Sequence, residues 1–303
     1  VYSETLLVDA AVYLQGGWDA GFTARDPAAN VTTIQSAASA VTFASVASGT
    51  PGIEGFTVAG GSGTEAYLPD QGFYGGGIYV YDSPAFIRDN VITGCGYASA
   101  TEFSGGGGIS VWNGSVTIEG NTIVDCVAQC GGGIYLYQAT ASIAGNAISG
   151  AEPNAEYTGS KQGGGIYARQ SSVTMSGNVV FGNTGYQEGG GVYARLSPLT
   201  MSGDSIRSNA TTANGGGICG DHSSVSMHDT YVADNIAAAM GGGVYHRAEL
   251  FEMTNCLVAG NGTSMIGGGV YADSCWGAWT NNTIDRNTSA YLAGNVQIGA
   301  VAA

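Results

Sequence analysis

The sequence predicts an all-β solenoid, in which short parallel strands coil around one axis, and three observations support this prediction. Glycine clusters recur along the chain, and each is followed by Ile or Val. These aliphatic residues, which we call the anchors, follow one another at spacings of 31, 25, 32, 26, 26, 26 and 26. Fixed columns of apolar residues follow every anchor. Such a period is typical of a repeat array. The anchors are Ile78, Ile109, Ile134, Ile166, Val192, Ile218, Val244 and Val270.

The apolar columns predict the strands of each coil. Nine residues after the anchors come Ile87, Ile118, Ile143, Met175, Met201, Met227, Met253 and Trp279. Fourteen after them come Ile92, Ile123, Ile148, Val180, Ile206, Val232, Val258 and Ile284. Within a segment the apolar residues recur at spacing two, as in Val173 and Met175, which is the strand period. We therefore expect three short strands per coil of about 26 residues, with neighbouring coils paired in parallel roughly 4.8 Å apart.

Composition excludes several classes of function. The 303 residues include 52 Gly and 17 Tyr, but only 8 Lys plus Arg against 23 Asp plus Glu. A nucleic-acid partner is not expected, since phosphate binding needs a basic surface. No apolar run reaches the roughly 18 residues that cross a bilayer, so membrane insertion is not expected either. Six Cys, and a chain that begins at Val1 without Met, favour a processed extracellular or cell-surface protein.

Seventeen residues after the anchors lies a polar column. Its side-chain amides are expected to hydrogen-bond along the stack as an internal ladder. The ladder residues are Asn183, Asn209, Asn235, Asn261 and Asn287. Earlier coils carry Cys95 and Cys126 in this column, one coil apart, which suggests a disulfide between them. Cys130 competes for Cys126, and no pairing is predicted for Cys219, Cys256 or Cys275.

The motifs "GGGIY" followed by "VFGN", "IRSN" or "VAGN" resemble the GGAI and FxxN repeats of chlamydial polymorphic outer-membrane proteins, with Ile or Val here in place of Phe. The phrases "IEGFTVAGG" and "SPAFIRDNVITG" look like those of secreted bacterial parallel β-helix proteins. The resemblance covers nearly all of the chain. It implies a right-handed parallel β-helix, and it is weak for function, because such proteins include adhesins, surface material and polysaccharide-active enzymes.

Two columns of the anchor strand should point outward, and together they predict a contact face for a ligand or a protein. One place after the anchors stand Tyr79, Tyr135, Tyr167 and Tyr193, among others. Three places after them stand Tyr81, Trp112, Tyr137, Arg169, Arg195, Asp221 and Arg247. Longer linkers, "GSGTEAYLPDQGFY", "GYASATEFS" and "AEPNAEYTGSKQ", precede this strand and should wall one side of the face.

Three interpretations of this face stay open. Aromatic rings stack on sugars, so the face could bind glycans. Tyr, Trp and Arg are also enriched at protein contacts. The rows could equally be structural ladders that support strand pairing. Catalysis has less support: only Asp221 with His222, Arg195 and Arg247 is reminiscent of a calcium-dependent polysaccharide lyase. No catalytic residue, metal ligand or cofactor is therefore predicted, with calcium as the one alternative.

The sequence predicts one continuous β-helix over residues 1–303, with irregular coils over 1–74 and regular coils over 75–303. Both ends are apolar and strand-like, without a polar cap, which leaves strand edges for another copy to pair with. The leading hypothesis is an extracellular structural protein whose copies assemble head to tail through their terminal coils into a surface fibre or sheath. The alternatives are a carbohydrate-binding adhesin and a calcium-dependent lyase.

Overall fold

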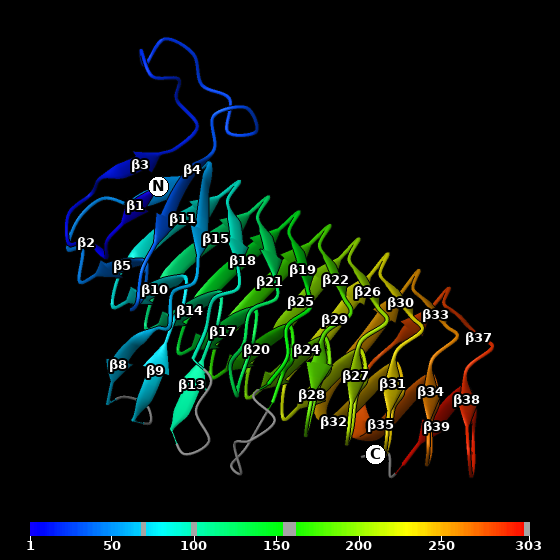
Figure 1. Ribbon diagram of the computed structural model, residues 1–303. Helices are drawn as coiled ribbons and strands as arrows, with labels where there is room; N and C mark the ends of the chain where they lie inside the picture. The colour runs from blue at the N-terminus through cyan, green and yellow to red at the C-terminus, as the bar shows by residue number, and fades with distance from the viewer. Residues whose placement is uncertain (68–70, 98–101, 154–161, 300–303) are drawn as a thin grey trace.

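A computed structural model describes residues 1–67, 71–97, 102–153 and 162–299. The strands wind into a stack of coils that runs from the N-terminal to the C-terminal end of the chain (Figure 1). Each regular coil contributes one strand to each of three long parallel sheets, which confirms the predicted parallel β-helix with three strands per coil. In the described residues no helix is long and apolar enough to cross a bilayer.

The first sheet contains the anchor strands. It comprises β2 (Leu6–Val8), β5 (Val41–Ala44), β10 (Ile78–Tyr81), β14 (Ile109–Trp112), β17 (Ile134–Tyr137), β20 (Ile166–Arg169), β24 (Val192–Arg195), β28 (Ile218–Asp221), β32 (Val244–Thr254), β35 (Val270–Trp276) and β39 (Val296–Ile298). Anchor pairs with anchor throughout, as in Ile78 with Ile109 and Ile134 with Ile166. The column begins at Leu6, which pairs with Val41, and Val41 in turn pairs with Ile78, although no glycine triplet precedes Leu6 or Val41.

The second and third sheets follow in each coil. The second comprises β3 (Tyr13–Gln15), β6 (Gly52–Glu54), β11 (Pro84–Arg88), β15 (Ser115–Glu119), β18 (Thr140–Ala144), β21 (Ser172–Ser176), β25 (Leu199–Ser202), β29 (Val225–His228), the end of β32 and β36 (Trp279–Thr280). The third comprises β1 (Tyr2–Ser3), β4 (Thr32–Gln35), β7 (Phe56–Ala59), β12 (Val91–Thr93), β16 (Thr122–Val124), β19 (Ala147–Ser149), β22 (Val179–Phe181), β26 (Ser205–Arg207), β30 (Tyr231–Ala233), β33 (Leu257–Ala259) and β37 (Thr283–Asp285).

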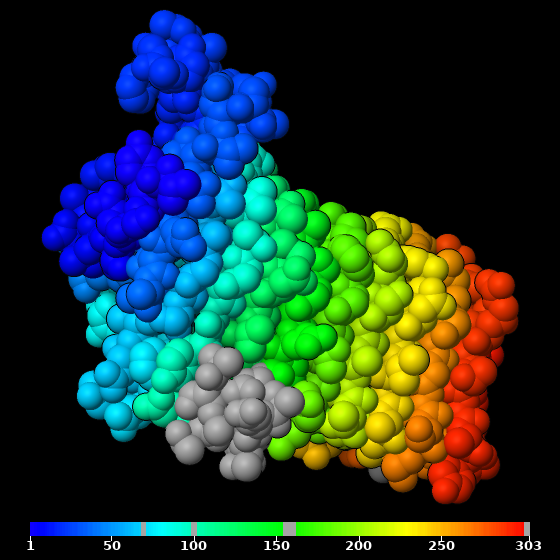
Figure 2. Space-filling view, in the orientation of Figure 1, coloured from blue at the N-terminus to red at the C-terminus, as the bar shows by residue number. Residues whose placement is uncertain are grey.

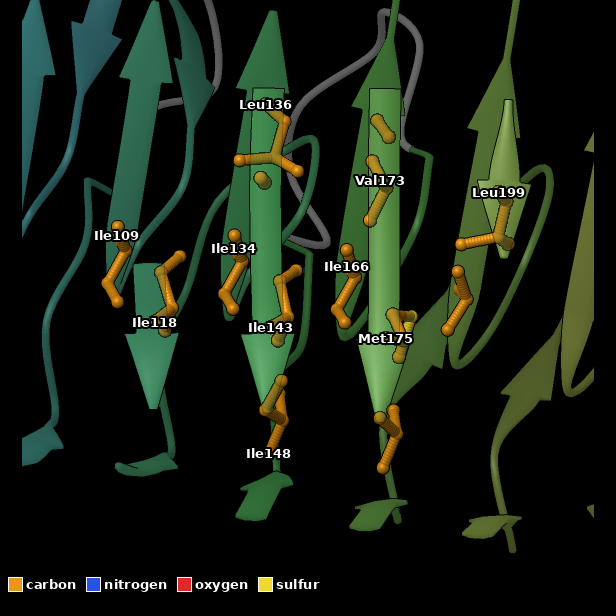
Figure 3. Close-up of a cluster of buried hydrophobic side chains, with 14 of the residues drawn as sticks. Ile109, Ile118, Ile134, Leu136, Ile143, Ile148, Ile166, Val173, Met175 and Leu199 are labelled. Atoms are coloured by element: carbon orange, nitrogen blue, oxygen red, sulfur yellow. The ribbon is translucent and has the colours of Figure 1, made fainter. Parts of the chain in front are cut away.

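The apolar columns meet inside the coil. Ile109, Ile134 and Ile166 stack in one row, and Ile118, Ile143 and Met175 stack in another (Figure 3). All six side chains are fully buried. Burying a side chain of this size stabilises the fold by roughly 1.5–3 kcal/mol. Because like stacks on like, the period of the sequence is also the period of the core.

Three corners turn each regular coil, and each corner has a residue in the left-handed region. These residues stand four, eleven and sixteen places after the anchor, for example Gln170, Gly177 and Gly182. Gly, Asn and Asp tolerate a positive φ best, which explains why they recur at corners. The next residue at each corner points inward and is buried, as for Ser171, Asn178 and Asn183.

Two polar ladders run through these corners. In the predicted one, Asn183 Nδ2 donates to Asn209 Oδ1 at 3.0 Å, and the same contact repeats through Asn235, Asn261 and Asn287. A second ladder, twelve residues after the anchors, was not predicted. It joins Asn90, Asn121, Asn146, Asn178 and Asp204. Both ladders satisfy backbone N–H groups that the corners bury.

The predicted disulfide between Cys95 and Cys126 is not formed. Each thiol instead contacts a backbone carbonyl of the coil before it. Cys95 Sγ lies 3.7 Å from Val58 O, and Cys126 Sγ lies 3.8 Å from Ile92 O. The two thiols therefore take the place that Asn183 and its successors occupy further along.

A return segment leads each coil back to the next anchor. In the later coils it holds a short strand, and these form a fourth parallel sheet: β23 (Thr184–Gly185), β27 (Ala210–Thr211), β31 (Ile236–Ala237), β34 (Gly262–Thr263) and β38 (Thr288–Ser289). The segment ends in the glycine triplet. Gly189 has a φ of +61°, and a Cβ on Gly190 would lie 2.4 Å from Gly216 O of the next coil. The triplet is thus required by a sharp turn and by close stacking of backbones.

Two additions interrupt the N-terminal coils. Residues 16–31, between β3 and β4, project from the N-terminal end of the body (Figures 1 and 2). A small sheet of β8 (Thr64–Ala66), β9 (Gly72–Tyr74) and β13 (Phe103–Gly105) lies beside the first sheet. It is built from two of the predicted linkers. Residues 68–70, 98–101 and 154–161 of the linkers lie outside the described part of the chain.

Candidate functional site

The first outward row is not an open face. Tyr79, Tyr135, Tyr167 and Tyr193 are all buried, in a second hydrophobic cluster outside the main core. The rings of the last three follow one another along the axis, with 5.4 Å between the ring centroids of Tyr135 and Tyr167 and 5.1 Å between those of Tyr167 and Tyr193. Tyr79 joins them through the ring of Tyr74, which lies 6.2 Å from Tyr79 and 5.8 Å from Tyr135. Burial raises the pKa of the phenols of Tyr79, Tyr135, Tyr167 and Tyr193.

The return segments cover this row. Gly189, at the end of one segment, lies against Tyr193, and Gly105 of β13 lies against the ring of Tyr135. The prediction that Tyr135, Tyr167 and Tyr193 form a contact face for a ligand or a partner is therefore wrong, because the chain itself occupies their outer side. Tyr79 is buried as well, but part of it borders a hollow described below. The rings of these tyrosines attach the return segments to the first sheet.

The second outward row remains accessible. Its residues pair in register from coil to coil: Tyr81, Trp112, Tyr137, Arg169, Arg195, Asp221 and Arg247. Half-buried aromatic residues form the N-terminal part of the row, and charged residues form the rest. The rings of Tyr81 and Trp112 lie 4.6 Å apart, and the Arg169 guanidinium stands 5.4 Å from the Tyr137 ring centroid.

At the aromatic end the row borders a hollow of about 280 Å³. We call it the aromatic hollow, and its lining consists of Ala66, Tyr67, Tyr79, Tyr81 and Trp112. Tyr67, which follows β8, is 68% exposed and stands at its edge. Sequence reasoning missed Tyr67, since it lies in a linker outside every repeated column. The one signal was an aromatic residue in a linker expected to flank the face.

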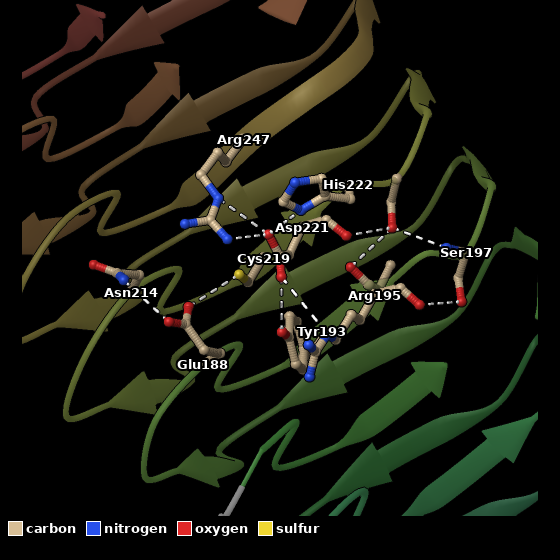
Figure 4. A network of polar contacts seen from close by, with 11 residues as sticks. Glu188, Tyr193, Arg195, Ser197, Asn214, Cys219, Asp221, His222 and Arg247 are labelled. Carbon is tan, nitrogen blue, oxygen red and sulfur yellow. Dashed lines mark hydrogen bonds and ion pairs between the residues drawn. The ribbon is translucent and has the colours of Figure 1, made fainter. Parts of the chain in front are cut away.

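At the charged end, Asp221 is the centre of a polar network (Figure 4). Arg247 Nη2 lies 2.6 Å from Asp221 Oδ1, His222 Nδ1 lies 2.8 Å from the same oxygen, and Arg195 Nε lies 3.9 Å from Oδ2. Partial burial opposes ionisation of Asp221, but the hydrogen bonds from Arg247 and His222 outweigh it and lower the pKa. The carboxylate is therefore ionised and already engaged by cations.

Behind Asp221 lies a second carboxylate, Glu188 of a return segment. It accepts a hydrogen bond from Asn214 Nδ2 at 3.1 Å and one from the Cys219 thiol at 3.2 Å. Burial raises the pKa of Glu188. These bonds fix the return segment above the gap that Cys219 leaves in the tyrosine row. In the described residues no three His, Cys, Asp or Glu side chains come together as metal ligands. Calcium stays an untested prediction.

The coil geometry defines a right-handed parallel β-helix protein, and comparison with known proteins agrees. Residues 107–289 match the family model described as "Right handed beta helix region", and the chain belongs to this family. No match was found among the curated proteins with which the chain was compared.

Solved structures resemble the chain in fold alone. The periplasmic alginate epimerase AlgG is 12% identical with a TM-score of 0.35, and the match covers 88% of this chain and 73% of AlgG. The A-module of the mannuronan C-5 epimerase AlgE4 of Azotobacter vinelandii is 12% identical with a TM-score of 0.34, over 98% of this chain and 91% of that module. The Dettilon tailspike protein is 12% identical with a TM-score of 0.32, over 98% of this chain and 61% of the tailspike.

Proposed function

We propose that this protein is an extracellular glycan-binding protein that holds a linear carbohydrate along the second outward row. The observation that carries the proposal is the aromatic hollow, in which Tyr67, Tyr81 and Trp112 present rings beside an open row of polar residues. Concave sites lined by aromatic side chains with a few polar groups are the usual form of a ligand site.

The chemistry of the row fits a sugar. The C–H faces of a pyranose stack on aromatic rings, while phenol and guanidinium groups donate hydrogen bonds to its hydroxyls. Tyr81, Trp112 and Tyr137 pair in register, so they stand one coil apart, or about 4.8 Å. The groups therefore repeat along one line parallel to the axis, which suits an extended polymer better than a compact ligand.

Binding to a glycan array followed by calorimetry of the best ligand tests the proposal. Tyr67→Ala is the most informative variant, because Tyr67 is exposed and its loss leaves the core intact. We expect at least a tenfold loss of affinity for Tyr67→Ala and for Trp112→Ala. Trp276→Ala, at an exposed tryptophan of β35, is the matched control and should bind as the wild type does. Unchanged affinity in both hollow variants would contradict the proposal.

End-to-end assembly into a surface fibre or sheath is the second candidate. In the described residues β2 pairs with β5 alone, and β39 pairs with β35 alone. The outermost coils also expose apolar side chains: Leu7 and Leu292 are each 65% exposed. Strands with a free edge and apolar neighbours favour pairing with a second copy in the same parallel register.

Sedimentation velocity over a range of concentrations, with negative-stain images, tests this assembly. We expect rods that lengthen with concentration, and we expect Leu7→Lys to prevent the growth. Single short rods at the highest concentration would rule the fibre out, and they would leave the glycan proposal untouched.

A further inference from the structure

A second cavity lies at the N-terminal end, between the projection of residues 16–31 and the first coil. Its volume is about 360 Å³, within the usual range for small-molecule sites. The lining residues are Tyr2, Glu4, Leu6, Gln15, Trp18, Asp19, Ala20, Phe22, Thr32, Ile34 and Phe56. The cavity is remote from the aromatic hollow and shares none of its residues.

The projection is held in place by its own contacts. Trp18 and Arg25 form an antiparallel bridge. The Asp19 carboxylate accepts hydrogen bonds from the Thr23 N–H at 2.7 Å and the Thr23 hydroxyl at 2.6 Å. Arg25 Nη1 lies 2.7 Å from Glu54 Oε1 of β6, which ties the base of the projection to the coil. The wall of the cavity that carries Trp18 and Phe22 is thus preformed, which lowers the entropic cost of binding.

The lining has one distinctive composition. Four aromatic side chains, three aliphatic side chains, two carboxylates, one amide and one hydroxyl surround the space, and none of these described lining residues is Lys or Arg. The nearby guanidinium of Arg25 is paired with Glu54. Hydrogen bonds from Thr23 lower the pKa of Asp19, so this carboxylate keeps its negative charge at neutral pH. Alkylated ammonium groups are attracted both to the faces of aromatic rings and to a negative charge of this kind.

We propose that this cavity binds a quaternary ammonium group, of the kind carried by choline, with Tyr2, Trp18, Phe22 and Phe56 around its methyl groups and Glu4 and Asp19 supplying the charge. A neutral apolar ligand would use the rings but not the negative charge of the two carboxylates, and a hydrated metal ion would gain nothing from the rings. An alkylated ammonium group satisfies both parts of the lining, and this assignment does not depend on glycan binding.

Choline chloride is the probe, titrated at constant ionic strength and followed by calorimetry and by tryptophan emission. We expect saturable binding, and at least tenfold weaker binding of 3,3-dimethylbutan-1-ol, which has the same shape without the charge. Binding of vesicles of phosphatidylcholine that is competed by choline supports a lipid headgroup as the source. Choline binding without vesicle binding supports the soluble cation.

Phe22→Gly is the decisive variant. Phe22 is 77% exposed and has a φ of +55°, so glycine removes the ring and suits the backbone. We expect its affinity for choline to fall at least fivefold, with an unchanged melting temperature. Asp19→Asn should weaken choline but not the neutral alcohol.

Three results would overturn the proposal. One is the absence of any heat or emission change at roughly 50 mM choline, where a site with a dissociation constant of about 1 mM is nearly saturated. Equal binding of the neutral alcohol is another. The last is a Phe22→Gly variant that binds choline as tightly as the wild type does, and if this variant also sediments differently, the cavity is a contact between copies.

Discussion

Asn209 offers the sharpest test of the idea that the corner ladders hold the coils together. Its Oδ1 accepts hydrogen bonds from Asn183 N and Asn183 Nδ2, both at 3.0 Å. Its Nδ2 donates to Val180 O and to Asn235 Oδ1, again at 3.0 Å. Asn209→Ala removes all four hydrogen bonds and keeps those of the backbone, from the N–H of residue 209 to Asn235 Oδ1 and from the Ile236 N–H to the carbonyl oxygen of residue 209. All four lie in the buried interior of the corner.

The magnitude follows from what is left without a partner. In the variant, the Asn183 N–H loses its acceptor and Val180 O loses a donor, and water cannot reach either group. A buried polar group that loses its partner costs about 1–3 kcal/mol, so we expect the variant to be less stable by roughly 2–6 kcal/mol. In a chain of this length, that corresponds to a fall in melting temperature of roughly 5–15 °C.

Urea denaturation followed by circular dichroism measures this change, and hydrogen exchange localises it, because repeat arrays need not unfold in one step. Asn281→Gly is the matched control. Asn281 makes an amide contact of 2.7 Å with Asn255 in the adjacent coil, but on the surface, and its φ of +55° suits glycine. We expect this control to lose less than about 1 kcal/mol. If both variants lost the same stability, the reasoning from buried ladders would be refuted.

Three further predictions concern the core and its titratable groups. Tyr135→Ala should cost about 3–5 kcal/mol in denaturant titrations, because the ring is buried under the chain; an unchanged midpoint would contradict that burial. Burial lowers the pKa of His246 to about 4, below its value in the unfolded chain. The contribution of His246 to the free energy of unfolding should therefore be constant above pH 6.5 and fall by about 3 kcal/mol between pH 6.5 and pH 4. His246→Leu should flatten this profile and His228→Ala, at an exposed histidine, should not. Burial raises the pKa of Asp204, so ionisation destabilises the fold as the pH rises through that value. Asp204→Asn should therefore melt above the wild type at pH 7 and lose this advantage near pH 4.

The repeat made much of the fold predictable, because equivalent positions in successive coils have the same surroundings and therefore carry residues of the same kind. The rows of Ile109 and Ile118 could be identified from the sequence alone, since a column that is apolar in all copies must face the inside. The ladder from Asn183 followed from the same argument. The ladder from Asn90 also follows a fixed column, twelve residues after the anchors. It was missed because Asp204, Thr230 and Cys256 interrupt the run of Asn in that column.

The outer rows were harder to predict, because their exposure depends on segments that do not repeat strictly. Strand alternation correctly points Tyr135 away from the core, yet the return segment covers it. The alternation of side chains along a strand shows which residues point away from the main core, but it does not show whether solvent or another segment of the chain lies on that side. The projection of residues 16–31 occurs once, so no column marks it, and the cavity that it forms was not predictable from a period.

The return segments also determine where the chain tolerates change. Anchors lie 26 residues apart in the later coils but 31 and 32 apart at two earlier places, and the second and third sheets keep their register across both. The additional residues therefore lie in the return segments, after the third sheet, and the glycine triplet then restores the path of the backbone. A foreign peptide grafted between Thr211 and Gly215 would be displayed on the outside without shifting any coil. Inserts placed at the same position in successive coils would therefore lie at fixed intervals of about 4.8 Å along the axis.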